Sequence, residues 1–324
     1  MSGRMTCVVL DDFASTALSS ADWSSLKDRV DVTSVSRHPG SEEELLELIG
    51  DAQIVVTIRE RIAFPRAVLQ RLPRLQLLVS TGMRSSAIDL AAARELGVTV
   101  VGTASSLTPP TELTWALILG LARHVVAEDA AVRSGAWQST VGMDLHGRTL
   151  GVLGLGRIGA AVARIGLAFG MDVVAYSENL SEERCAEIGV RRAESLPALL
   201  SGSDVVSIHL KLSERTQGLV GKRELALMRP SALLINTSRA GIVDQEALLR
   251  ALEDGNIGGA GLDVYGEEPL PADDPLRSAP RTLLTPHLGY VTEDNLRTYF
   301  TQAVEDIAAF LDGTPVRVLN AERD

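Results

Sequence analysis

The chain has 324 residues, of which 45% are hydrophobic and only 4% aromatic, and its formal net charge is −11. A negative field of this size repels phosphate backbones and anionic lipid surfaces, so the charge disfavours nucleic acid and membrane partners. The length exceeds the usual size of one hydrophobic core and predicts two domains, and the aliphatic composition favours parallel α/β sheets.

Targeting and redox features of the chain favour the cytoplasm. It contains no run of about eighteen apolar residues, and its N-terminus leads directly into a strand pattern instead of a signal sequence. The two cysteines, Cys7 and Cys185, stand among apolar or helix-forming residues without metal-ligand spacing. We therefore expect a cytoplasmic protein with two small core cysteines and no metal site.

The first third of the chain alternates short β-branched runs with helical patterns, which is typical of parallel βαβ units. The expected strands are residues 7–10, 53–58, 75–80 and 98–101. A helical segment over residues 111–132 follows, with apolar side chains on nearly all sides. This pattern predicts one long helix that is buried between domains.

A glycine-rich turn follows the next apolar run. Residues 149–159 read Thr-Leu-Gly-Val-Leu-Gly-Leu-Gly-Arg-Ile-Gly. Gly154 permits a tight turn, Gly156 lets the backbone approach a pyrophosphate, and Gly159 lets the following helix pack closely on the strand. This spacing also arises by chance, but here a buried-strand pattern precedes it and helical spacing follows it. The flanks therefore predict a dinucleotide-binding turn, with the phosphates held at the helix N-terminus.

Further strand patterns follow the glycine turn and suffice for a complete dinucleotide-binding sheet. They cover residues 172–176, 204–209, 232–236, 259–264 and 282–284, and a helical pattern covers 292–311. Because the turn lies in the middle of the chain, the simplest architecture inserts one domain into another. We expect an α/β fold of two Rossmann-like or flavodoxin-like domains with parallel, doubly wound sheets. The dinucleotide-binding domain spans 105–287, and the discontinuous first domain comprises 1–104 and 288–324.

Three polar residues follow different strand patterns after the glycine turn, where ligands of open α/β sheets bind. Arg239 carries a permanently charged guanidinium that could grip a carboxylate, and His287 is able to exchange a proton near neutral pH. Glu268 lies in a proline-rich loop. Taken singly, these are more often a solvated loop arginine, a surface glutamate and a structural histidine. Their joint occurrence at strand ends of one sheet favours a catalytic group.

At these residues the chain resembles the D-isomer-specific 2-hydroxyacid dehydrogenase family, over nearly its whole length. The matching segments are the glycine turn and residues 78–89, 234–244, 261–269 and 285–289. The resemblance implies NAD(P)-dependent interconversion of a 2-oxo acid and a D-2-hydroxy acid, with the first domain binding this small-molecule substrate. It also implies that Arg239 binds and polarises the substrate and that His287, paired with Glu268, is the general acid and base.

The resemblance extends to coenzyme and substrate contacts. Those implied for the coenzyme, beside the three glycines, are Arg157, Ile158, Ser177, His209, Thr237 and Asp263, and those implied for the substrate are Arg59, Thr81 and Gly82. Ser177 occupies the position where an NAD-preferring site usually has Asp or Glu. Glu178 is one residue later, and no Arg or Lys follows until Arg184, so the sequence favours NAD without excluding NADP.

A rival interpretation is an NAD(H)-sensing binding protein like the transcriptional corepressors of the same fold, which keep a similar triad. An L-hydroxyacid dehydrogenase is disfavoured, because those enzymes generally begin with the nucleotide domain. Members of the resembled family are usually dimers through that domain, so we expect a homodimer. The apolar helix from Thr111 with Trp115, together with Trp137, could supply its surface, and core packing explains the same residues equally well.

Overall fold

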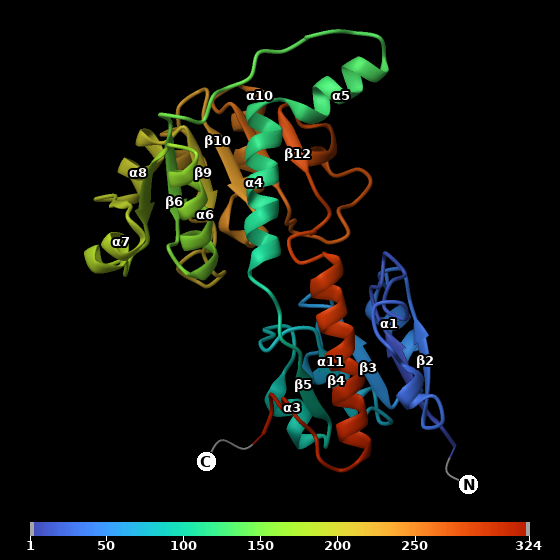
Figure 1. Cartoon of the computed structure of the whole chain (residues 1–324). Coiled ribbons are helices and arrows are strands. Elements are labelled where there is room, and N and C mark those ends of the chain that lie inside the picture. Colours follow the sequence, from blue (N-terminus) through green and yellow to red (C-terminus); the bar gives the residue numbers. More distant parts are fainter. Residues whose placement is uncertain (1–2, 322–324) are drawn as a thin grey trace. The chain divides into compact units, whose positions relative to one another are not determined.

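The chain leaves its first structural unit after residue 106 and returns to it at residue 291. The computed structural model describes residues 3–321. Unit 1 lies within Met1–Ser106 and Val291–Asp324, and unit 2 is Leu107–Tyr290 (Figure 1). Unit 2 is therefore one uninterrupted segment between two segments of unit 1.

Unit 1 is built on a parallel sheet in the order β2-β1-β3-β4-β5. This is the order of flavodoxin-like doubly wound sheets, in agreement with the expected fold class. The strands are β1 (Met5–Val9), β2 (Val30–Ser34), β3 (Ile54–Thr57), β4 (Leu77–Ser80) and β5 (Thr99–Gly102). The helices are η1 (Ser24–Leu26), α1 (Glu42–Ile49), α2 (Arg66–Gln70), α3 (Leu90–Glu95) and α11 (Glu293–Leu311).

The helix α11 completes the core of unit 1 from the far end of the sequence. It contacts β4 and buries Tyr299, Phe300 and Ile307 completely. The segment after it is held to β5, because the Asn320 side chain accepts from the N–H of Val100 at 3.0 Å and donates to the Val98 carbonyl at 2.8 Å. The N-terminal third of the chain and its last helix therefore share one core.

Unit 2 is built on a parallel sheet in the order β12-β11-β10-β9-β6-β7-β8. Read from β8 to β11, this is the Rossmann strand order 3-2-1-4-5-6, in which β6 is strand 1. The strand β12 is added beside β11 at the edge. The strands are β6 (Thr149–Leu153), β7 (Asp172–Tyr176), β8 (Arg191–Arg192), β9 (Val205–Ile208), β10 (Leu233–Asn236), β11 (Gly259–Leu262) and β12 (Thr282–Leu284). The helices are α4 (Thr108–Ala122), α5 (Val125–Arg133), α6 (Arg157–Ala168), α7 (Glu182–Ile188), α8 (Leu196–Gly202), α9 (Lys222–Leu225), η2 (Ala240–Ile242), α10 (Gln245–Glu253) and η3 (Pro275–Ser278).

Local sequence explains where several elements of unit 2 begin and why its strands are buried. Side-chain oxygens of Ser181, Ser195 and Asp244 accept hydrogen bonds from backbone N–H groups in the first turns of α7, α8 and α10. The strands β9 and β10 are buried at every residue, as the apolar runs of a parallel sheet covered on both faces require.

The expectation of one long helix over residues 111–132 is wrong. The structure has two helices, α4 and α5, separated by His124 in the left-handed conformation with φ of 51°. The α4 helix packs on β10, β11 and α6, and it buries Trp115. The α5 helix buries none of its side chains, so the apolar pattern of the second half does not correspond to a core.

Other sequence expectations concern the cysteines, membranes and metals. Cys7 and Cys185 are both buried and free, as expected for core cysteines. Within residues 3–321, no helix is long and apolar enough to cross a bilayer. The same part of the chain contains no cluster of His, Cys, Asp and Glu side chains that could hold a metal ion.

Candidate active site

The glycine turn connects β6 to α6, and its three glycines have different surroundings. Gly154 has φ of 101°, and a Cβ there would lie 2.6 Å from the carbonyl oxygen of His209. A Cβ on Gly159 would overlap the Gly154 carbonyl oxygen. A Cβ on Gly156 would meet no atom within 4 Å, and no side chain caps the α6 helix that begins there. The turn is therefore closed by Gly154 and Gly159, and its backbone is open at Gly156, as bound phosphates require.

Further candidate coenzyme residues lie in the first turn of α6 and after the strands on either side of β6. Arg157 and Ile158 form the first turn of α6, and Ser177 follows β7 directly. His209 follows β9, where its ring nitrogen Nε2 lies 2.8 Å from Ser207 Oγ, and desolvation lowers the pKa of His209 to about 4. The imidazole of His209 is therefore neutral at physiological pH. Thr237 follows β10, and its hydroxyl lies 2.9 Å from the hydroxyl of Thr114 on α4.

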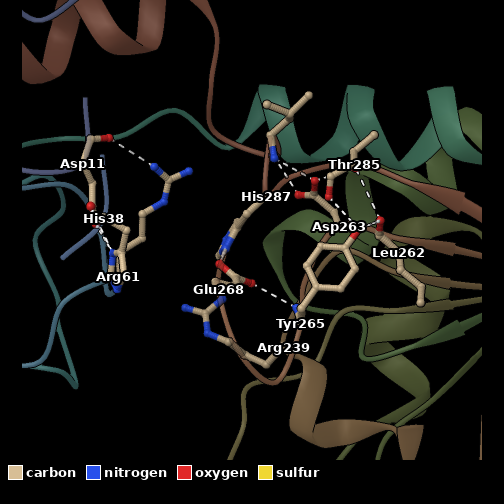
Figure 2. A network of polar contacts seen from close by, with 12 residues as sticks. Asp11, His38, Arg61, Arg239, Leu262, Asp263, Tyr265, Glu268, Thr285 and His287 are labelled. Carbon is tan, nitrogen blue, oxygen red and sulfur yellow. Dashed lines mark hydrogen bonds and ion pairs between the residues drawn. The ribbon is translucent and has the colours of Figure 1, made fainter. Parts of the chain in front are cut away.

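The structure brings Arg239, Glu268 and His287 together (Figure 2). They follow β10, β11 and β12, which are neighbours in the sheet, so their loops leave the same edge. His287 Nδ1 lies 2.6 Å from Glu268 Oε2, and the other carboxylate oxygen accepts from the N–H of Tyr265 at 3.0 Å. About a fifth of each paired side chain is exposed, 22% for His287 and 23% for Glu268. This pair is sheltered but still reachable by a small molecule.

The backbone around Arg239 is held by the residue that ends β10. The side chain of Asn236 donates to the Arg239 carbonyl at 3.0 Å and accepts from the N–H of Ser238 at 3.0 Å. The guanidinium of Arg239 donates to the Ser238 carbonyl at 2.7 Å, and Figure 2 shows it beside the Glu268 carboxylate. A fixed cation thus lies next to the histidine–glutamate pair.

Asp263 holds the loop that carries His287. It is fully buried, and its carboxylate accepts from Thr285 Oγ1 at 2.6 Å, Leu288 N at 2.7 Å and Gly289 N at 2.8 Å. Burial raises the pKa of this carboxyl, against the opposing effect of the hydrogen bonds and of His287. Because these donors lie on both sides of His287, the position of the imidazole depends on Asp263.

Two residues of this loop region were not identified from the sequence. Thr285 donates to Asp263, and the Tyr265 hydroxyl donates to the carbonyls of Leu262 at 3.1 Å and Thr285 at 2.9 Å. Tyr265 thereby joins the ends of β11 and β12. The available signal was their place inside the segments 261–269 and 285–289, which carry the resemblance.

In unit 1, the structure brings Arg59, Thr81 and Gly82 together at the ends of β3 and β4. The N–H of Arg59 donates to Thr81 Oγ1 at 2.9 Å, and its guanidinium donates to the Thr81 carbonyl at 3.5 Å. Gly82 has φ of 144°, and a Cβ there would lie 2.7 Å from the Arg59 guanidinium. Glycine at this position therefore allows the arginine to lie against the backbone of the loop.

A second polar cluster in unit 1 was not identified from the sequence. His38 Nδ1 lies 3.1 Å from Asp11 Oδ1, and Arg61 donates to the Asp11 carbonyl at 3.3 Å (Figure 2). Asp11, His38 and Arg61 follow β1, β2 and β3, so they belong to the carboxyl edge of the sheet, as Arg59 and Thr81 do. The sequence placed Asp11 and Arg61 shortly after expected strands, and it gave no such signal for His38, because β2 was not identified.

Comparison with known proteins bears on this site. Residues 115–289 match the family model described as "D-isomer specific 2-hydroxyacid dehydrogenase, NAD binding domain". A glyoxylate reductase of Aeropyrum pernix is 39% identical over 296 residues, which cover 88% of each chain. A D-3-phosphoglycerate dehydrogenase of Methanocaldococcus jannaschii is 36% identical over 84% of this chain and 52% of its own length. The crystal structure of a phosphoglycerate oxidoreductase from Vibrio cholerae superposes with a TM-score of 0.90 at 35% identity, covering 95% of this chain and 99% of that one.

Proposed function

Since this chain belongs to the D-isomer-specific 2-hydroxyacid dehydrogenase family, whose coenzyme is NAD(H), we propose that it interconverts a 2-oxo acid and the corresponding D-2-hydroxy acid. The observation that carries the proposal is the His287–Glu268 pair, with 2.6 Å between Nδ1 and Oε2, next to the Arg239 guanidinium. An acid–base group and a fixed cation at one sheet edge are what reduction of a 2-oxo carboxylate needs.

In this proposal His287 is the general acid and base. Its Nδ1 is engaged by Glu268, so the proton that passes to or from the substrate oxygen is carried by Nε2. The Glu268 carboxylate orients the ring and compensates the positive charge when the imidazole is protonated. The nicotinamide, when bound, supplies or accepts the hydride, which no protein side chain can do.

Arg239 binds the substrate carboxylate and polarises the adjacent keto group. A guanidinium is permanently charged and forks toward a carboxylate, so it orients the acid and stabilises negative charge that develops on the keto oxygen. The hydrogen bonds that join Asn236 to the Arg239 carbonyl and the Ser238 N–H support this role, because they fix the point from which the arginine side chain extends.

The remaining binding residues are assigned by the same proposal. The three glycines, Arg157, Ile158, Ser177, His209, Thr237 and Asp263 serve the coenzyme in unit 2, Asp263 through the loop that it holds. Arg59, Thr81 and Gly82 serve the substrate in unit 1, which we take to be the substrate-binding domain. The Arg59 guanidinium suits a carboxylate, and Thr81 and Gly82 hold it against the loop.

Short 2-oxo acids are the first substrates to test, because the relatives include glyoxylate reductases. The assay follows NADH absorbance with glyoxylate, hydroxypyruvate and a branched 2-oxo acid. We expect at least one of them to be reduced, and His287→Asn to abolish turnover while NADH still binds. NADH binding with no turnover of any 2-oxo acid would overturn the proposal and favour an NAD(H)-sensing protein.

We also propose that the protein is a cytoplasmic homodimer. The segment over residues 125–141 in unit 2 carries exposed apolar side chains, with 78% of Trp137 and 93% of Val141 accessible. Trp115 is buried and stacks on Phe169 at 4.8 Å between ring centroids, so of the two tryptophans considered only Trp137 is available for an interface. Sedimentation velocity of the protein and of Trp137→Ser tests this, and a wild-type monomer would contradict it.

A further inference from the structure

An ion pair lies across the end of the strand that leads into the glycine turn. Glu178 follows β7, Arg215 follows β9, and Arg215 Nη1 lies 2.8 Å from Glu178 Oε2. In the sheet, β6 lies between these two strands. The pair therefore connects two loops on either side of the Gly154–Gly159 turn, although its members are 37 positions apart in the sequence.

The loop that carries Arg215 has a defined conformation. Thr216 Oγ1 accepts from the N–H of Ser213 at 2.8 Å and donates to the Lys211 carbonyl at 2.6 Å. The N–H of Gly218 donates to the Gly241 carbonyl at 2.8 Å, which ties the loop to the segment after β10. The backbone thus holds Arg215 where it reaches Glu178, and only the two long side chains need to move to separate them.

The position of this pair corresponds to the adenosine ribose of a bound dinucleotide. In Rossmann domains the pyrophosphate lies at the first glycine turn, and the residue at the end of the second strand meets the ribose 2′ position. Here that strand is β7, and Ser177 and Glu178 follow it. A cation beside Glu178 is therefore a cation beside the 2′ substituent, which is a hydroxyl in NAD(H) and a phosphate in NADP(H).

Arg184, another cation near the glycine turn, is engaged elsewhere. Arg184 on α7 donates to Glu187 at 2.6 Å and to the Leu155 carbonyl in the glycine turn at 3.4 Å. The ion pair between Arg215 and Glu178 is exposed to solvent, since 68% of the Arg215 side chain and 69% of the Glu178 side chain are accessible. Exposed ion pairs contribute little to stability, so a phosphate or a ribose can separate this one at small cost.

We propose that Glu178 and Arg215 decide which dinucleotide binds, and that they admit both. With NADP(H), Arg215 leaves Glu178 and binds the 2′-phosphate, whose charge and three oxygens suit a guanidinium. With NAD(H), Glu178 leaves Arg215 and, from one residue beyond the usual position, accepts from the ribose hydroxyls as the carboxylate after this strand usually does. Ser177 is neutral and repels neither form. This inference rests on the dinucleotide-binding unit and is independent of the substrate.

Fluorescence titration of the purified protein with NADPH and with NADH tests the proposal without any turnover. We expect the two dissociation constants of the wild type to agree within about tenfold. Arg215→Gln should weaken NADPH binding by about ten- to a hundredfold, the effect of losing a charge-assisted hydrogen bond, and change NADH binding by less than about threefold. Glu178→Gln should weaken NADH and leave NADPH unchanged or tighter.

The matched control is Arg192→Gln, which removes another partly exposed arginine of unit 2 that pairs with Glu182 at 3.3 Å on the β8 side of the sheet. It should alter neither dissociation constant. A wild type that binds NADPH more than about tenfold more weakly than NADH would overturn the proposal, as would equal effects of Arg215→Gln on both coenzymes. Circular dichroism and NADH binding of each variant distinguish loss of selectivity from loss of folding.

Discussion

Replacement of Asp263 by Asn measures how strongly the loop carrying His287 is held. The buried carboxylate accepts three hydrogen bonds, from Thr285 Oγ1, Leu288 N and Gly289 N, at 2.6 to 2.8 Å. Asn has the same shape but only one acceptor oxygen, so at least one of the two backbone N–H groups must face the amide NH₂ group. The substitution therefore removes a hydrogen bond without creating a cavity.

The size of the effect follows from these contacts. Leaving one buried donor unpaired costs about 1–3 kcal/mol, and loss of the charge weakens the remaining bonds by about 1 kcal/mol. Burial raises the pKa of the Asp263 carboxyl, so the neutral amide recovers part of the desolvation cost. We expect the free energy of unfolding to fall by about 2–3 kcal/mol.

The same substitution should lower the rate of turnover. His287 has φ of 54°, a left-handed conformation that a non-glycine residue keeps only when its neighbours hold it. Once the bonds on either side loosen, the imidazole loses its fixed position beside Glu268. We expect kcat for 2-oxo acid reduction to fall about 10- to 100-fold, with a smaller change in the dissociation constant of NADH.

Urea unfolding monitored by circular dichroism and NADH absorbance kinetics provide the two measurements. Asp273→Asn is the matched control, because it makes the same chemical change at an exposed residue of unit 2 and should alter neither quantity. If Asp263→Asn unfolds and turns over like the wild type, the claim that this carboxylate positions His287 is refuted.

Two further predictions concern the glycine turn and a buried carboxyl in unit 1. Gly159→Ala places a Cβ on the Gly154 carbonyl oxygen and should lower the free energy of unfolding by about 1–3 kcal/mol. Gly156→Ala has open space around the new Cβ and should keep wild-type stability. It should bind NADH at least about tenfold more weakly, because the backbone at Gly156 is where the pyrophosphate approaches. Equal behaviour of the two variants in urea unfolding and NADH titration would contradict the assigned roles. Burial raises the pKa of Asp306 from 3.8 to about 6, although the nearby Arg317 acts in the opposite direction. Between about pH 4 and 6 the carboxyl group is therefore protonated in the folded state and ionised in the unfolded state. Its contribution to stability falls as the pH rises through this range. Urea unfolding should therefore show Asp306→Asn gaining up to about 3 kcal/mol relative to the wild type from pH 4 to pH 7, and an unchanged difference across this range would contradict the raised pKa.

The sequence predicted the parts of this protein that depend on neighbouring residues. The glycine spacing at Gly154, Gly156 and Gly159 specifies a backbone conformation and a close approach, and the structure has both. Apolar runs of four or five residues predicted most strands of both sheets, because a parallel strand covered on two faces must be apolar throughout. The polar strand β2 (Val30–Ser34) and the two-residue β8 lack such runs and were not identified.

The tertiary structure decided everything that depends on strand order. Pairing of β10, β11 and β12 brings Arg239, Glu268 and His287 to one edge, and the 2.6 Å contact between the last two cannot be read from a separation of 19 positions. The break at His124 was hidden as well, because the apolar pattern continues through it while only α4 has a core to pack against. The position of Arg215 beside Glu178 was also hidden in the sequence. The sequence offered no cation near Ser177 before Arg184, and the sheet supplies one because β7 and β9 lie on either side of β6.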